Sequence, residues 1–121
     1  MNGIFKLSNN IHFLPVVHGS SNFSREIKNH ILSEKCDCLA VALPPEFQTS
    51  VEEGIDLLPQ ITLSTQQEED GGLNYVPIDP SQPLIAGLRV AKQEGISRQF
   101  IDWSTPDYET RHSNFPDTFS L

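Results

Sequence analysis

The sequence lacks the features that mark nucleic-acid-binding, secreted and membrane proteins. Its 121 residues include only eight lysines and arginines against sixteen aspartates and glutamates, a net charge of −8. Nucleic-acid-binding proteins present a basic face to the phosphates, whereas the basic residues here are few and scattered. No apolar run approaches the roughly 18 residues of a membrane helix, and the N-terminus lacks the pattern of a signal peptide. We therefore expect no nucleic-acid or membrane partner.

Cysteine is also scarce. The chain has two, Cys36 and Cys38, and a metal site built on thiolates usually needs more cysteines or histidines at paired spacing. Two free thiols indicate a reducing, cytoplasmic compartment. The length is that of one domain. We expect a single domain over residues 1–105, followed by a polar segment, 106–121, that is a tail or the start of an element whose remainder is missing.

Three well-known motifs are absent. No G-x-G-x-x-G follows a strand, so a dinucleotide-binding fold is poorly supported. The chain has no G-x-x-x-x-G-K-[ST] phosphate loop and no G-x-S-x-G nucleophile turn. These absences disfavour three large enzyme classes.

What the chain does contain is an alternation of strand and helix patterns. Apolar runs lie at 11–17 and 38–43, and residues 73–78 and 98–102 are interpreted as two further strands. Segments with apolar residues at helical spacing lie at 23–35, 46–58 and 83–95. Continuously apolar strands are typical of parallel sheets that are covered on both faces. The order β-α-β-α-β-α-β predicts an α/β fold, a Rossmann-like three-layer half with a short, mainly parallel sheet.

Local signals refine this prediction. Residues 61–66 form either an extra hairpin strand beside 73–78 or an extended loop, because the Asp70-Gly71-Gly72 turn lies between them. Gly54 weakens the second helix by about 1 kcal/mol relative to alanine. Pro83 suits the first turn of the third helix, and Gly95 suits the left-handed position after its end.

A candidate site follows from the predicted sheet. Ligands of open parallel sheets bind outside the carboxyl ends of the strands. The four strands end near His18, Glu46, Asp79 and Asp102. Such a set can bind a divalent metal or provide a base and an acid. Each residue also has a local explanation, as a loop or helix cap, a carboxylate at a helix start, or a turn residue.

The remaining histidines and one arginine are predicted to lie outside this site. His12 is near the start of the first strand, His30 is on the first helix and His112 is in the tail, and all three are interpreted as surface residues. Arg89 lies in mid-helix, where pairing with a carboxylate is the simplest expectation.

Several of these residues carry a resemblance to a known group. The matching segments are Val17-His18-Gly19-Ser20 with Phe23-Ser24, Cys38 to Pro44, Tyr75 to Asp79, and Gly95 to Asp102. Together they resemble the opening of the TraB/TIKI/ChaN-like (erythromycin-esterase-like) superfamily, over roughly residues 11–105. Some members of that group are metal-dependent hydrolases or proteases, and others bind haem.

The resemblance implies roles for particular residues. His18 matches the histidine after the first strand, and Asp102 matches the acidic end of a later strand. The glutamate of the second strand falls on Ala42, with Glu46 close by, and the family's second half has no counterpart here. Together with the strand-end set, the resemblance gives His18, Glu46 and Asp102 as the predicted catalytic residues. The predicted ligands for Mn, Zn or Co are His18, Asp79 and Asp102.

Two functional hypotheses result. The first is the N-terminal part of a TraB/TIKI/ChaN-like metal-dependent hydrolase acting on a small molecule or peptide. The alternative is a non-catalytic module that binds a ligand or a protein. Under either hypothesis a four-stranded sheet leaves two edges, which are available to a missing C-terminal half or to a second copy in a homo-oligomer.

Overall fold

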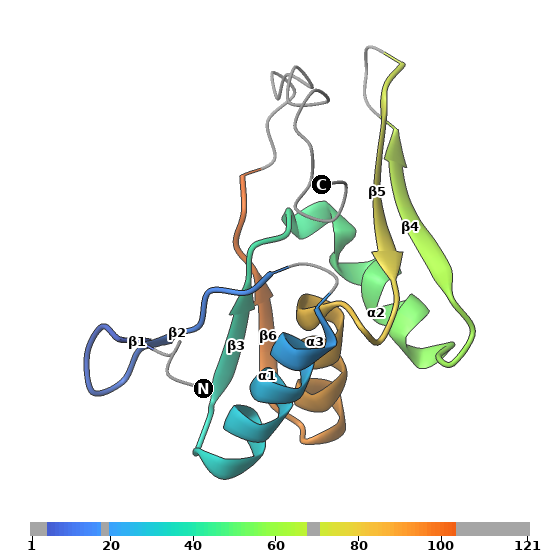
Figure 1. The fold of residues 1–121 in the computed structure, drawn as a ribbon. Coiled ribbons are helices and arrows are strands. Elements are labelled where there is room, and N and C mark those ends of the chain that lie inside the picture. The colour runs from blue at the N-terminus through green and yellow to red at the C-terminus, as the bar shows by residue number, and fades with distance from the viewer. Residues whose placement is uncertain (1–4, 18–19, 68–70, 104–121) are drawn as a thin grey trace.

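The computed structural model describes residues 5–17, 20–67 and 71–103 (Figure 1). Its elements follow in the order β1 (Phe5–Lys6), β2 (His12–Phe13), α1 (Ser21–Ser33), β3 (Cys38–Val41), the 3-10 helix η1 (Pro45–Phe47), α2 (Gln48–Asp56), β4 (Thr62–Gln67), β5 (Leu73–Ile78), α3 (Pro83–Gln93) and β6 (Ser97–Phe100). The chain is thus a small mixed α/β fold with one parallel strand pair, which confirms the predicted α/β class.

The strands of the described residues pair two by two. β3 and β6 form a parallel pair, whereas β1–β2 and β4–β5 are antiparallel. The sequence predicts that residues 73–78 join a mainly parallel sheet, but β5 pairs with β4 because a short turn favours an antiparallel hairpin. The hairpin alternative for residues 61–66 is therefore confirmed. Of the predicted strand 11–17, only His12–Phe13 is extended and paired, since Pro15 has no N–H to donate to a ladder.

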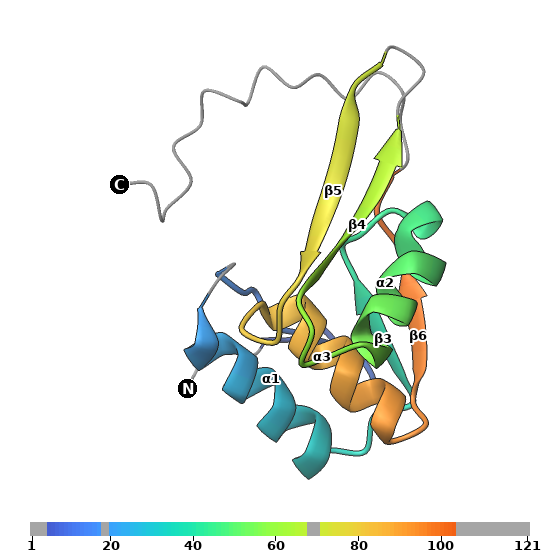
Figure 2. The same ribbon diagram turned by 90° about the vertical axis from the view of Figure 1, so that its right-hand side faces the viewer.

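The core lies between the helices and the parallel pair. α1 and α3 lie side by side on one face of β3–β6 (Figure 2). One buried cluster joins this pair to α2, α3 and the hairpin: Val41, Phe47, Val51, Ile55, Ile78, Ile85, Leu88 and Phe100. A smaller cluster joins α1 to α3 through Ile27, Ile31 and Val90. Gly87 permits this close approach, because a Cβ there would lie 2.9 Å from Ile27 Cγ2.

The other face of the parallel pair is open in the described part of the chain. Alternate side chains of both strands are exposed, namely Cys38, Ala40, Ser97 and Gln99. The apolar run 38–43 predicts strands covered on both faces, and that prediction is wrong for this pair. Small side chains account for the difference, since cysteine and alanine count as apolar in the sequence but leave little surface to bury.

The β4–β5 hairpin extends beyond the rest of the fold as an arm (Figures 1 and 2). One of its faces packs on α2 through residues that include Ser64 and Ile78, both buried. The opposite face exposes more than half of Leu63, Leu73 and Tyr75. Among the described residues, no helix is long and apolar enough to cross a membrane.

Candidate functional site

Two of the predicted catalytic residues lie at the carboxyl end of the parallel pair. Glu46 is exposed on η1, which follows β3. Asp102 follows β6, and its backbone N–H donates to the Leu43 carbonyl at 3.1 Å. The third predicted catalytic residue, His18, lies outside the described residues.

The two aspartates make local hydrogen bonds. Asp79 Oδ1 accepts from the Ser81 backbone N–H and the Ser81 hydroxyl, each at 2.9 Å, and so stabilises the turn that leads into α3. Asp102 Oδ1 accepts from the N–H of the exposed Trp103 at 2.8 Å. Both contacts correspond to the turn and cap roles that the sequence predicts as alternatives to metal binding.

The described ranges contain no group of three or more histidine, cysteine, aspartate or glutamate side chains that could hold a metal ion. The predicted metal set of His18, Asp79 and Asp102 includes a residue outside those ranges. The divalent-metal site therefore stays a prediction.

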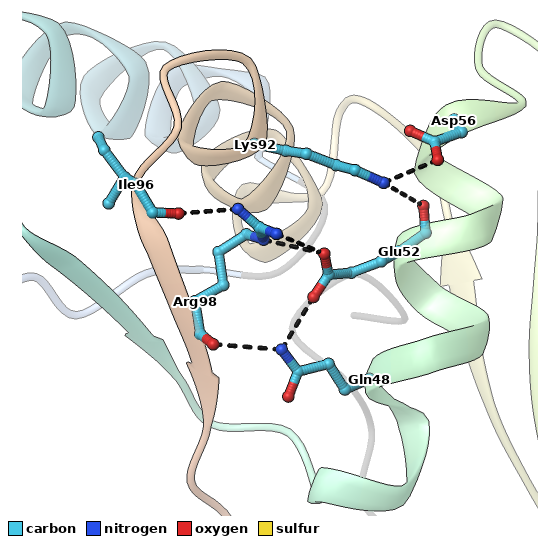
Figure 3. A network of polar contacts seen from close by, with 6 residues as sticks. All are labelled: Gln48, Glu52, Asp56, Lys92, Ile96 and Arg98. Carbon is cyan, nitrogen blue, oxygen red and sulfur yellow. Dashed lines mark hydrogen bonds and ion pairs between the residues drawn. The ribbon is translucent and has the colours of Figure 1, made fainter.

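A polar network links α2 to β6 (Figure 3). Arg98 donates to Glu52 Oε1 from Nε and Nη2, each at 2.9 Å, and Gln48 donates to Glu52 Oε2 at 2.8 Å. Burial raises the pKa of Glu52, but the hydrogen bonds from Gln48 and Arg98 and the charges of Arg98 and Lys92 outweigh it. The net effect lowers the pKa of Glu52 below its ordinary value.

The same network reaches α3. Lys92 Nζ lies 2.7 Å from Asp56 Oδ2 and 3.3 Å from the Glu52 carbonyl oxygen (Figure 3). Every charged group in it has an opposite partner, and Arg98 also donates to the Ile96 carbonyl at 2.8 Å. A network that is satisfied in this way positions α2 against β6 and α3 and leaves no charge free for a ligand.

The described residues form a groove between α1 and α3, called the α1–α3 groove below. Its lining residues are Ser24, Arg25, Lys28, Pro80, Ala86, Arg89, Val90 and Gln93. Its volume is about 490 Å³, within the range of roughly 300–1,000 Å³ that is usual for small-molecule sites. Its described lining has three basic side chains and no acidic one, in a chain with twice as many acidic as basic residues.

These three cations lack partners in the described part of the chain. Arg25, Lys28 and Arg89 make neither an ion pair nor a side-chain hydrogen bond there. The expectation that Arg89 pairs with a carboxylate is thus not met among the described residues. Helical spacing places Arg25 and Lys28 on one face of α1, so the sequence contained that signal. No sequence pattern predicts that Arg89 lies beside Arg25 and Lys28, because their proximity depends on the packing of α1 against α3.

Comparisons of the chain with protein-family models, with curated proteins and with solved structures found no match. The resemblance to the TraB/TIKI/ChaN-like superfamily accordingly stays a prediction from the sequence.

Proposed function

We propose that this chain is a ligand-binding module that holds a small organic anion, with a carboxylate or phosphate group, in the α1–α3 groove. The observation that carries the proposal is the gathering of Arg25, Lys28 and Arg89 in a groove whose described lining residues include no acidic one. It develops the non-catalytic alternative rather than the hydrolase.

The chemistry of the lining favours an anion. Arginine presents a planar set of N–H donors that matches carboxylate and phosphate oxygens, and lysine adds a point charge. The chain has eight basic residues, and three of them line this one groove. An anion there gains attraction from three charges that have no ion-pair partner among the described residues, so no ion pair within that part of the chain is broken.

The fold adds a smaller favourable contribution. α1 begins at Ser21 and α3 at Pro83, and the groove includes Ser24 in the first turn of α1 and Pro80 just before α3. The N-terminal end of a helix carries a partial positive charge. Both helices therefore direct their positive ends toward the same end of the groove.

The test is calorimetric titration of the untagged chain with citrate and with inorganic phosphate, repeated at increasing salt. Arg89→Gln and Arg25→Gln should each weaken binding about tenfold or more, because a hydrogen bond to a charged group contributes about 1.5–3 kcal/mol. Lys35→Gln removes an exposed cation outside the groove lining and should leave binding unchanged. Equal losses in all three variants would indicate only nonspecific charge attraction, and absence of binding to either anion would contradict the proposal.

The metal-dependent hydrolase is the second candidate function. Its support is the resemblance, which includes a Rossmann-like half, together with Glu46 and Asp102 at the carboxyl end of the β3–β6 pair. The discriminating assay is hydrolysis of ester and peptide substrates with added Mn²⁺, Zn²⁺ or Co²⁺. The hydrolase predicts metal-dependent turnover that His18→Ala and Asp102→Asn abolish, while the binding module predicts no turnover.

A further inference from the structure

Two histidines that are 18 positions apart in the sequence meet in the fold. His12 Nδ1 and His30 Nε2 are 3.0 Å apart, and the ring centroids are 5.1 Å apart with a tilt of 55°. His12 lies on β2 and His30 in the last turn of α1. Their positions in the sequence predict two separate surface residues, but both are half-buried. Their approach is produced by the tertiary structure.

The distance between the two nitrogens is close to that of a metal chelate. Imidazole nitrogens bind Zn²⁺ at about 2.0–2.1 Å, so two of them at a tetrahedral angle lie roughly 3.4 Å apart. Within the pair, the N–H of one ring donates a hydrogen bond to the nitrogen of the other. A cation that replaces this proton requires the nitrogens to separate by a few tenths of an ångström and the rings to turn, so that both lone pairs point at the metal.

The fold permits this adjustment. His30 is fixed on a helix of thirteen residues, whereas His12 belongs to a hairpin whose strands are two residues each. The chain after β2 is anchored by Leu14 and Val16, which pack against the Ile27-containing cluster on α1 and α3. His30 is therefore held rigidly, whereas His12 lies on a short hairpin that can shift slightly to accommodate a metal ion.

We propose that His12 and His30 form a two-imidazole site for a transition-metal cation, which cross-links the β1–β2 hairpin to α1. Imidazole nitrogens suit Zn²⁺, Cu²⁺ and Ni²⁺ rather than Mg²⁺ or Ca²⁺, which prefer oxygen ligands. Because the described residues supply no third ligand, water completes the coordination and the affinity is modest. The site is distinct from the α1–α3 groove and from the predicted set with His18 and Asp79.

The experiment is titration of the untagged full-length chain with Zn²⁺ alone, followed by calorimetry and thermal melting. His12→Asn and His30→Gln retain a polar amide near the position of each ligating nitrogen but remove the imidazole. Each should lower the Zn²⁺ affinity at least tenfold, and the double variant should lose little more than either one. His112→Asn is the matched control and should bind as the unmodified chain does.

A second measurement does not depend on the folding of a variant. Substoichiometric Cu²⁺ broadens the NMR signals of nearby nuclei, and it should broaden the imidazole and amide signals of His12 and His30 first. Broadening that begins at His18 or His112, or Zn²⁺ affinity that persists in folded His12→Asn and His30→Gln, would place the metal elsewhere and overturn the proposal. Failure of the unmodified chain to bind Zn²⁺ or Cu²⁺ would also overturn it.

Discussion

Replacement of Gly54 by alanine is expected to destabilise the protein, although alanine is the better helix former. Gly54 lies in α2 where the helix meets the β4–β5 hairpin. A Cβ at this position would overlap Ile78 Cδ1 and lie 2.9 Å from Thr62 Oγ1. Ile78 is 1% exposed, so its side chain has little room to move away. From the sequence, Gly54 is expected only to weaken the helix. The structure shows why a glycine is needed at this position.

The magnitude follows from two opposing contributions. Alanine in place of Gly54 should gain about 1 kcal/mol in helix propensity. Overpacking of a well-packed core typically costs about 1–3 kcal/mol, and direct overlap with a buried methyl places this site at the upper end. We expect the free energy of unfolding to fall by about 1–2 kcal/mol, which lowers the melting temperature by roughly 4–8 °C in a chain of this size.

A double-mutant cycle isolates the contact. Ile78→Val removes Cδ1 and alone should cost about 0.5–1.5 kcal/mol. In the Gly54→Ala background the same change removes the overlap, so urea unfolding followed by circular dichroism should give a favourable coupling of about 1 kcal/mol. Ile85, equally buried but on α3, provides the control, because Gly54→Ala and Ile85→Val should be additive. Stabilisation by Gly54→Ala, or zero coupling with Ile78→Val, would refute the reasoning.

Three further predictions concern other contacts. Because Arg98 and Gln48 lower the pKa of Glu52 below its ordinary 4.5, the stability that this carboxylate contributes is present above pH 4.5 and is lost as the pH falls through the lower, folded-state pKa. Glu52→Gln should therefore lower the free energy of unfolding by about 1–2 kcal/mol at pH 7. It should also make the free energy of unfolding at pH 7 more similar to that at pH 3, as measured by urea unfolding. Glu53→Gln, which changes an exposed carboxylate, should leave the difference between the two pH values as it is in the unmodified chain. Thr62 Oγ1 is buried and has no hydrogen-bond partner among the described residues. Thr62→Val should therefore raise the free energy of unfolding, measured by urea titration, by about 1 kcal/mol. A decrease would show that this hydroxyl is hydrogen-bonded. The strands β4 and β5 carry no charged residue, and the outer face of the arm is apolar and exposed. This face should support weak self-association, which sedimentation velocity can detect and Leu63→Asp should abolish. An unmodified chain that stays monomeric at millimolar concentration would contradict this prediction.

The local elements were largely predictable because their causes lie within a few residues. The spacing of Ile27 and Ile31 predicts α1, and both are buried on the face that meets α3. Pro83 opens α3 as expected, and Gly95 adopts the predicted left-handed conformation with a φ of 69°. These features depend on propensity, periodicity and backbone freedom, which a sequence states directly.

The candidate site was less predictable, because strand partners and side-chain neighbours are settled by long-range packing. The predicted strand ends place Glu46 and Asp102 at one end of the β3–β6 pair. For Asp79 the sequence allows both a turn role and a metal role, and only the structure shows the hydrogen bonds of the turn. The approach of His12 to His30 likewise depends on where a short hairpin folds back on α1.

The sequence by itself determined the α/β class, the positions of the three helices and the acidic balance of the chain. Only the tertiary structure decided that β5 pairs with β4 and that Arg89 lies beside Arg25 and Lys28 in one groove. The physical reason is that periodicity specifies which face of each element is apolar, but not which other element covers it. That choice depends on the close packing of all elements at once, as Gly54 and its contact with the hairpin illustrate.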